Sequence, residues 1–567
     1  MNKLLIFIFL FFLNNLQAQK YCNPIDLKML LSGTFGELRT NHFHAGIDLK
    51  TNGVIGHNIY SIDDGYVSRI KVSSWGYGKA IYINHKNGKT SVYAHLKEFS
   101  EKIDSIIKLQ QYKNESFEID YYLPHKKLKI QKCEKIALSG NSGSSFGPHL
   151  HFEIRETKNQ IPINPLSEGI NIEDDIPPYI NGLKLYSINN AIIDNEKNDK
   201  ILKLNLINGK YKTKEIPVIK GDFGIGISTF DRSNNSKNKN GVYEINIYID
   251  KVLFYKFIAD KLNFNTTRYI NAYIDYKENK TNKIKYHKCF RYNNNKLKNY
   301  KKIINNGIIN VNDSNMHHVK IEISDINGNI SSVEFNFQSK IKQNNDHIIE
   351  NAHNEDNKIR KKFLYAQTNI FKTNEFKLHM KKNSLYHDMI FEYEIKDSIE
   401  GIHSKIHSCH NEYVPVHEKY IISIKSKVPK RLKDKAYIAK KNRNGKFNYI
   451  SEGIWENDFL RGKTRSFGDF CVLIDTIPPS INGINIYQGK NISKQHNIKC
   501  KIKDNQSGIK TYKGEINGEW VLMEYDHKSN TLTYNICSKL IKGNNILNIN
   551  VTDKLKNKTS YSAEFIY

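Results

Sequence analysis

The sequence feature that most limits the fold is an internal repeat. Residues 177–186 correspond to residues 478–487, and each copy begins with Pro-Pro, contains Asn-Gly and comes shortly after an acidic residue. The segments that the copies open also end alike, in an Asp followed by an Asn (Asp325 and Asn329; Asp553 and Asn557). Short alternating runs separated by Asn, Gly and Asp turns are typical of antiparallel β-sandwiches. We therefore predict Ig-like β-sandwich modules at 171–340 and 475–567.

The rest of the chain needs further domains, because 567 residues are too many for one core. The polar, charged run 341–362 is predicted to be a linker. Residues 363–474 alternate again and are predicted to form another β-rich module, while 19–170 form a separate N-terminal domain. Aromatic residues make up 11% of the chain, including 34 Tyr, which favours a mostly β fold.

The first residues indicate export. Lys3 precedes an unbroken apolar run, residues 4–13, and Ala18 offers a small residue for cleavage. Such a run is too short to cross a bilayer as a helix, so we predict a signal peptide at 1–18 rather than an anchor. The mature chain is then expected without a transmembrane helix, in the periplasm, associated with the cell envelope or secreted.

The net charge of +28 leaves two interpretations open. It can attract an anionic partner such as cell wall, lipid headgroups or nucleic acid. The interpretation we favour is compositional, because Lys, Asn and Ile are enriched together and the charge is spread along the chain. No nucleic-acid-binding motif is present, so no nucleic-acid partner is predicted. None of the seven Cys forms a CxxC pair, and their disulfide pairing stays open.

The N-terminal domain has its own pattern of elements. Residues 80–84 and 91–96 alternate on either side of Asn87-Gly88, which predicts a hairpin. A second strand follows Asp64-Gly65, and a final one runs from His149 to Ile154. Apolar residues at helical spacing predict a helix in 99–112.

The strand at 149–154 carries the first candidate site. Side chains alternate along a strand, so Leu150, Phe152 and Ile154 are predicted to face the core and His149 and His151 the other side. Two imidazoles on one face suit a metal or an acid–base site. The alternative is a pair of exposed histidines on a half-buried strand.

Two further positions complete the candidate set. His44 and Asp48 are ligand types that suit zinc, and His95 lies on the predicted hairpin. A catalytic zinc needs three protein ligands and one open position for water. The five residues therefore supply three ligands and leave two histidines for proton transfer.

These segments resemble the lysostaphin/LytM-type family of zinc peptidoglycan endopeptidases. The family carries an H-x-x-x-D segment, a Tyr-x-His-Leu-like segment and an H-x-H segment, and this chain has them in the same order, with matching glycine turns over 30–167. The resemblance implies an antiparallel β peptidase domain with a substrate groove. It also implies that His44, Asp48 and His151 bind one Zn²⁺ and that His95 and His149 are catalytic.

Three other histidines and one carboxylate have weaker claims. His42 and Glu153 are candidates for orienting a ligand, although an exposed loop histidine and a surface carboxylate explain them as well. His407 and His410 are expected at the surface. The long stretch 98–131 departs from the compact family pattern and follows His95, so we expect it to wall or cover the groove.

The function implied by the resemblance is that of a zinc metalloendopeptidase that hydrolyses stem peptides or peptide cross-links of peptidoglycan, and we expect a D,D-endopeptidase. A second hypothesis is a non-enzymatic module that binds the wall or activates a hydrolase, but relatives of that kind typically lose the metal residues. A third gives the main role to the C-terminal modules, which would bind the wall or a protein partner.

Overall fold

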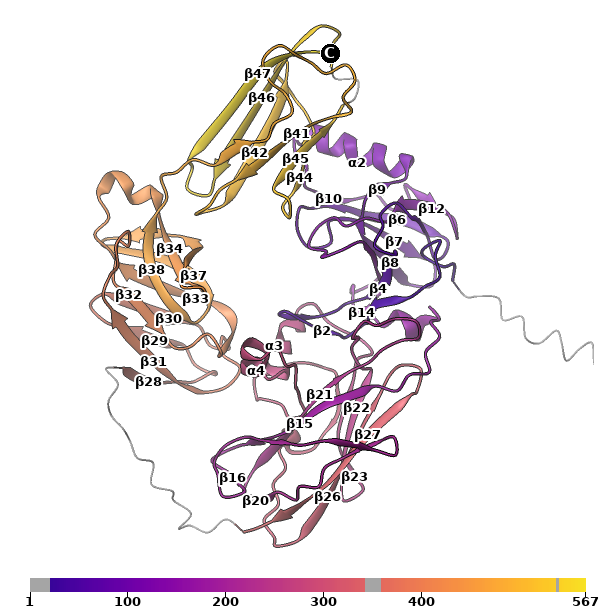
Figure 1. The fold of residues 1–567 in the computed structure, drawn as a ribbon, viewed down its shortest axis with the longest axis vertical. Coiled ribbons are helices and arrows are strands. Elements are labelled where there is room, and N and C mark those ends of the chain that lie inside the picture. The colour runs from indigo at the N-terminus through magenta and orange to yellow at the C-terminus, as the bar shows by residue number, and fades with distance from the viewer. Residues whose placement is uncertain (1–20, 342–357, 537–539) are drawn as a thin grey trace, which may run out of the picture.

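The computed structural model describes residues 21–341, 358–536 and 540–567, so the expected signal peptide 1–18 lies outside the described residues. The fold is mostly β, as predicted. Four β-rich units follow one another around a ring (Figure 1). We name them the N-terminal unit (21–170), the second unit (171–341), the third unit (358–475) and the C-terminal unit (476–567). No helix in the described part of the chain is long and apolar enough to span a membrane.

The N-terminal unit is built on a sheet whose main path runs β1-β4-β13-β8-β7-β6-β10, with a small sheet β5-β12-β9 beside it. Its elements are β1 (Leu31–Gly33), β2 (Leu38–Arg39), β3 (His42–Phe43), β4 (Ile47–Lys50), β5 (Asn58–Tyr60), β6 (Gly65–Val72), β7 (Lys79–His85), β8 (Lys89–Leu96), β9 (Glu98–Phe99), α2 (Glu101–Lys113), β10 (Ile119–Tyr122), β11 (Lys129–Ile130), β12 (Lys135–Leu138), β13 (His149–Glu156), β14 (Pro162–Ile163) and the 3-10 turn η2 (Pro165–Glu168).

The predicted elements of this unit are confirmed. The Asn87-Gly88 turn joins β7 and β8, the final strand is β13, and the helix is α2. Leu150, Phe152 and Ile154 of β13 have no exposed surface and lie in the core, as the alternation predicted. A disulfide between Cys22 and Cys133 ties the start of the described chain to this unit.

The stretch 98–131 adds an edge strand to the main sheet. It forms α2, which buries Ile103 and Ile107 in the core, and β10, which pairs with β6. Strand β10 is the end of the main path, and β8, β7 and β6 separate it from β13. The expectation that this stretch walls or covers the groove stays a prediction. Its apolar residues and its edge pairing direct it to the far side of the sheet, where it meets the C-terminal unit (Figure 1).

The second unit places two sheets around one core. Its elements are β15 (Tyr179–Ser187), β16 (Ile192–Ile193), β17 (Lys200–Leu202), β18 (Asn205–Ile207), β19 (Lys210–Lys212), β20 (Val218–Lys220), β21 (Phe223–Phe230), β22 (Glu244–Ile249), β23 (Val252–Ile258), η3 (Thr267–Tyr269), α3 (Ile270–Tyr273), α4 (Tyr276–Thr281), β24 (His287–Lys288), β25 (Tyr300–Ile303), η4 (Ile304–Gly307), β26 (Met316–Ser324) and β27 (Ile330–Ser339).

A loop of the N-terminal unit is built into this core. Phe35, Leu38 and Phe43 are each at most 5% exposed and belong to the same apolar cluster as the strands of the second unit. The backbone N–H of Phe43 also donates to the hydroxyl of Thr267 at 2.9 Å. The segment 34–44 therefore takes its shape from both units, and we call it the shared loop.

The third unit also has two sheets, with β28 at one edge. Its elements are β28 (Ile359–Phe363), β29 (Asn369–Lys372), β30 (Phe376–Met380), β31 (Met389–Lys396), β32 (Ile406–Cys409), β33 (Pro415–Lys425), η5 (Lys430–Lys435), β34 (Ala436–Lys441), β35 (Phe447–Glu452), β36 (Ile454–Glu456), β37 (Phe459–Ser466) and β38 (Gly468–Ile474).

Two sequence predictions fail in the third unit. The linker expected at 341–362 ends earlier, because residues 359–362 already belong to β28, while 342–357 lie outside the described residues. Charged side chains are common on edge strands. In this segment they give a composition that resembles that of a linker. His407, expected at the surface, is fully buried, and its Nδ1 lies 2.8 Å from the hydroxyl of Tyr393.

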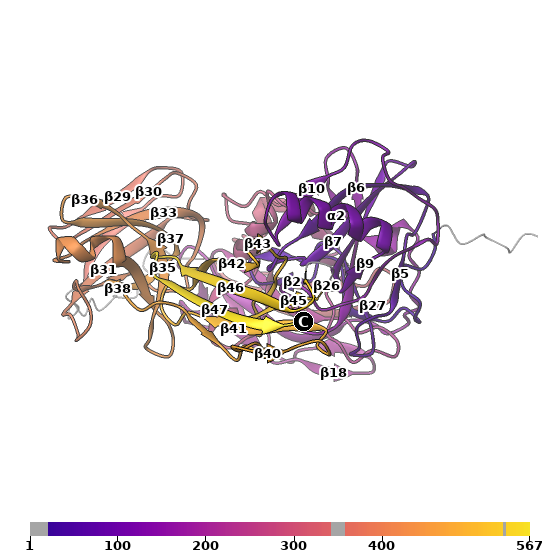
Figure 2. The same cartoon turned by 90° about the horizontal axis from the view of Figure 1, so that it is seen from above.

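The C-terminal unit closes the ring. Its elements are β39 (Ser480–Asn482), β40 (Lys490–Asn491), β41 (Asn497–Lys503), β42 (Ile509–Ile516), β43 (Glu519–Trp520), β44 (Glu524–Asp526), β45 (Thr531–Asn535), β46 (Asn544–Asp553) and β47 (Lys558–Ile566). Apolar residues from both of its sheets pack into one hydrophobic core. Leu522 packs into the core of the N-terminal unit, and Lys79 pairs with Glu524 at 2.9 Å. From above, the C-terminal and N-terminal units again lie side by side (Figure 2).

We expect Phe43→Ala to destabilise the protein by about 3–5 kcal/mol, because it leaves a cavity where the shared loop enters the core of the second unit. Thermal unfolding followed by circular dichroism measures the effect. Phe146→Ala is the matched control, since that ring is fully exposed, and its melting curve should match that of the wild type. Equal melting temperatures for the two variants would mean that the loop does not depend on the second unit.

Candidate metal centre

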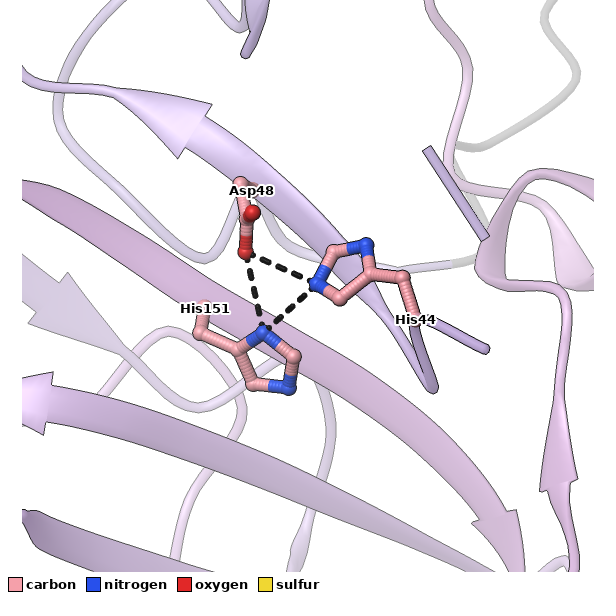
Figure 3. A group of neighbouring side chains, drawn as sticks. All are labelled: His44, Asp48 and His151. Carbon is pink, nitrogen blue, oxygen red and sulfur yellow. Dashed lines mark hydrogen bonds and ion pairs between the residues drawn. The ribbon is translucent and has the colours of Figure 1, made fainter. Parts of the chain in front are cut away.

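Three side chains converge at the centre of the main sheet (Figure 3). Asp48 on β4 lies directly opposite His151 on β13, and His44 comes just before β4. The ligand atoms are His44 Nε2, Asp48 Oδ1 and His151 Nδ1. They lie 3.0 Å (His44 to Asp48), 2.9 Å (His151 to Asp48) and 3.0 Å (His44 to His151) apart. Ligands of a tetrahedral zinc lie about 3.3 Å apart when each is about 2.0–2.1 Å from the ion, so the group needs only a small expansion.

The hydrogen bonds made by the outer atoms of these side chains determine which lone pairs face the centre. His44 Nδ1 lies 2.8 Å from the carbonyl oxygen of Thr34, and His151 Nε2 lies 2.8 Å from Glu153 Oε1. A carbonyl or carboxylate oxygen only accepts, so these two nitrogens carry the protons and the inner nitrogens present lone pairs. Arg39 donates to Asp48 Oδ2 at 2.9 Å, which leaves Oδ1 for the centre. The donor set therefore fits a metal ion.

Glu153 accepts a hydrogen bond from the outer nitrogen of His151. It has no exposed surface, so the alternative of a surface carboxylate is wrong. Arg155 Nε donates to its Oε2 at 2.6 Å, and the hydroxyl of Tyr77 donates to its Oε1. The ring of Tyr77 also stacks on that of His151, with centroids 5.2 Å apart. Residues 149, 151, 153 and 155 share one face of β13. Glu153 was a candidate on the sequence, and the same alternation could also have assigned Arg155 to the site.

His95 and His149 lie beside the three ligand atoms. Their ring centroids are 4.8 Å apart, and His149 Nε2 lies 3.4 Å from Asp48 Oδ1. His95 Nδ1 lies 2.9 Å from the carbonyl oxygen of Ser142, and His149 Nδ1 lies 2.8 Å from that of Gly147. By the same argument, each neutral ring has its lone pair on Nε2. His95 has a φ of 59°, a left-handed conformation that costs about 1–3 kcal/mol and is typical of functional positions.

The charges of the site follow from this geometry. Burial lowers the pKa of His95 to about 3, and the neighbouring His151 and His149 add to the effect. Burial opposes a proton on His151, but carboxylates on both of its nitrogens raise its pKa to about 9. Burial likewise opposes charge on Asp48, yet the imidazoles around it hold the pKa of its carboxyl well below the usual range. A metal ion that binds at this centre therefore competes with a proton for His151.

His42 is the predicted candidate that the structure leaves apart. Its side chain is exposed, and its Nδ1 lies 2.9 Å from the carbonyl oxygen of Thr40 in its own turn. Within the part of the chain that the structure describes, no hydrogen bond joins it to His44, Asp48 or His151. The simpler interpretation of an exposed histidine is confirmed, although His42 lies on the short strand β3 and not in a loop.

The C-terminal unit contacts the loops that border His149. Lys528 Nζ donates to the carbonyl oxygen of Asn141 and lies 3.3 Å from that of Ser145, in the turn before β13. The ring of His527 lies against that of Trp75, with centroids 3.6 Å apart. Neither contact was predictable from the sequence, because a basic residue and a histidine in a turn carry no sign of their partner.

Comparison with known proteins assigns the N-terminal unit. Residues 42–112 match the model of peptidase family M23, and residues 360–475 match that of a Zu5-like domain. DD-carboxypeptidase/endopeptidase Mpg of Neisseria meningitidis serogroup B is 32% identical over 133 residues, which are 24% of this chain and 24% of that protein. Peptidoglycan DD-endopeptidase ShyA of Vibrio cholerae is 26% identical over 165 residues, 28% of this chain and 31% of that protein.

Among solved structures, a zinc containing peptidase from Vibrio cholerae is similar over 26% of this chain and 39% of that one, at 24% identity and a TM-score of 0.19. The chain thus spans less than a third of the length of the curated relatives described above. The matched segment begins at His42 and contains His44, Asp48 and His95. The N-terminal unit of this chain is a peptidase family M23 domain.

Proposed function

We propose that the protein is a zinc metalloendopeptidase that hydrolyses peptide bonds of peptidoglycan. The observation that carries the proposal is the convergence of two imidazole lone pairs and one carboxylate oxygen, with two further histidines alongside. A catalytic zinc site has three protein ligands and one open position, and these five residues supply both parts. The relatives named as endopeptidases of this family support the substrate class.

His44, Asp48 and His151 would hold one Zn²⁺. When bound, zinc polarises a carbonyl oxygen and lowers the pKa of a water molecule to about 7. His149 Nε2 points its lone pair toward the same centre, so it can take a proton from the attacking water and pass it to the leaving amine. The carbonyl oxygen of Gly147 fixes the orientation of this ring by accepting a hydrogen bond from Nδ1–H.

His95 needs one more step to stabilise an oxyanion. Its Nδ1–H is held by Ser142, so the neutral ring presents a lone pair at Nε2 and has no proton to offer there. It can donate to a developing negative charge only after it has taken up a proton during the reaction. We therefore assign both histidines to proton transfer. His149 accepts the first proton, and His95 takes up a proton later in the reaction.

The preferred bond is the D,D-cross-link between directly joined stem peptides. Action on this polymer places the protein outside the cytoplasm, in agreement with the signal peptide predicted at 1–18. The units beyond the peptidase domain would bind the wall or a protein partner, and the contacts of Lys528 beside the site give the C-terminal unit a position from which to influence access.

Metal analysis tests the ligand assignment. We expect one zinc per chain in the purified wild type, and a loss of zinc in Asp48→Ala because the carboxylate links both ligand histidines. His42→Ala is the matched control, an exposed histidine two positions before a ligand, and it should keep its zinc. Zinc retained by Asp48→Ala would contradict the assignment.

Digestion of purified sacculi tests the activity. The wild type should release muropeptides that are cut at D,D-cross-links, and a chelator should abolish the release. His149→Ala should keep its zinc and lose at least about 100-fold in rate, the usual contribution of a general base. Zinc binding without any release from sacculi would reject hydrolysis in favour of a non-enzymatic wall-binding role.

The support of His151 can be tested through metal affinity. Glu153→Gln removes the negative charge that polarises the outer N–H of His151, and we expect zinc affinity to fall about 10–100-fold. Competition with a chromophoric chelator measures the change. Glu156→Gln, at the end of the same strand and paired with Lys261, is the control and should bind zinc like the wild type. Equal affinities for both variants would show that Glu153 does not tune the ligand.

A further inference from the structure

A second group of ligand-type side chains lies away from the peptidase centre. The carboxylate oxygens of Asp174, Asp231 and Asp325 come within 4.8 Å of one another. Asp174 is on the segment that leaves the N-terminal unit, Asp231 directly follows β21, and Asp325 directly follows β26. The chain thus brings three carboxylates together from three separate places.

These charges lack a counter-charge. Among the described residues, none of the three aspartates forms an ion pair with a Lys, Arg or His, whereas Asp199, Asp260 and Asp275 each pair with a lysine. Asp231 is only 4% exposed, and its Oδ1 has no hydrogen-bond partner. An ionised carboxylate in such a position is unfavourable unless a cation compensates it. Burial, together with the charges of Asp174 and Asp325, raises the pKa of Asp231 to about 8.

The three aspartates line a common cavity. Its accessible volume is about 20 Å³, and residues of the N-terminal unit, among them Thr34 and Asn164, line it as well. A space of that size holds one water molecule or one ion. The buried, unpartnered oxygen of Asp231 therefore belongs to a group that encloses room for a single small ligand.

The arrangement recurs in the C-terminal unit. Asp475, Asp504 and Asp553 also bring their carboxylate oxygens within 4.8 Å. Asp504 directly follows β41 as Asp231 follows β21, and Asp475 precedes its Pro-Pro pair at the same distance as Asp174. The structural counterpart of Asp475 is thus Asp174 rather than its neighbour Asp175.

The same asparagine contacts hold both groups. Asn329 donates from its backbone to Asp325 Oδ1 at 2.9 Å and from its side chain to the carbonyl oxygen of Asp174 at 2.9 Å. Asn557 donates in the same way to Asp553 Oδ1 at 2.8 Å and to the carbonyl oxygen of Asp475 at 3.0 Å. Two segments with different surrounding sequences thus have the same arrangement of carboxylates and asparagine. Binding of the same kind of ligand would explain this.

We propose that Asp174, Asp231 and Asp325 form a binding site for one divalent cation of the Ca²⁺ type. All of the candidate ligand atoms are oxygens, which are the ligands of hard cations and not of zinc in its usual N/S sites. Ca²⁺ accepts irregular oxygen sites, whereas Mg²⁺ requires near-octahedral geometry and retains several waters, for which a cavity of about 20 Å³ has little room. The cation would join the segment that leaves the peptidase domain to the second unit.

Calcium binding to the full-length mature chain tests the site. After removal of metals, equilibrium dialysis with ⁴⁵Ca²⁺ compares the wild type with Asp231→Asn and with Asp222→Asn, a control at the other end of β21. We expect Asp231→Asn to bind one Ca²⁺ fewer per chain than the wild type and the control. Any Ca²⁺ taken up by the His44–Asp48–His151 group is common to all three proteins and cancels in the difference.

Thermal melting separates loss of the site from loss of the fold. In chelator, Asp231→Asn should melt at or above the temperature of the wild type, because the amide stays neutral beside the two other carboxylates at any pH, whereas Asp231 must hold a proton to do so. In millimolar Ca²⁺ the order should reverse, with the wild type higher by several degrees. Asp174→Asn, at a half-buried position, should show the same reversal if Asp231→Asn does not fold. Equal Ca²⁺ stoichiometry in the wild type and the variants, or an unchanged order of melting, would overturn the proposal.

Discussion

Each histidine of the peptidase site gives its outer N–H to an oxygen that can only accept, and the chemistry of the site depends on this. Three of these acceptors are backbone carbonyls, those of Thr34, Ser142 and Gly147, and the fourth is the carboxylate of Glu153. Three of the nitrogens fixed in this way, those of His44, His149 and His151, lie within 3.4 Å of Asp48 Oδ1. A metal ion then meets ligands that are already in the correct tautomer and orientation, so little reorganisation opposes binding.

This dependence explains which parts of the site the sequence could reveal. The alternation in 149–154 predicted the face on which His149 and His151 lie, because strand geometry alone decides it. It could not predict the acceptors, since a backbone carbonyl is present at every residue and only the path of the loops selects Thr34 or Ser142. Nor could it predict how deeply Glu153 is buried. Arg155 covers it, and Phe264 of the second unit lies over Arg155, with the guanidinium 4.7 Å from the ring centroid.

Sequence predictions outside the site were limited for a similar reason. β28 looked like a linker because an edge strand needs few apolar residues, and only its pairing with β31 identifies it. His407 was expected at the surface because the sequence shows no further ligand set around it, but its ring packs against those of Tyr393 and Phe376 from other strands. The stretch 98–131 follows His95 in the chain, yet pairing with β6 carries it to the far end of the sheet. In each case a partner distant in the sequence decided the outcome.

The shared loop makes the second unit part of the peptidase site. Thr34 holds His44 through its carbonyl oxygen, and its hydroxyl accepts from the backbone N–H of Gly241 at 2.8 Å. Gly241 can approach so closely only without a side chain, since a Cβ there would lie 2.8 Å from the backbone of Glu37. The preceding residue, Asn240, pairs through its backbone with Asp231 of the acidic group. The residue that follows β21 is thus joined through Asn240 and Gly241 to Thr34, which accepts from His44, and a cation bound at Asp231 would stabilise this connection.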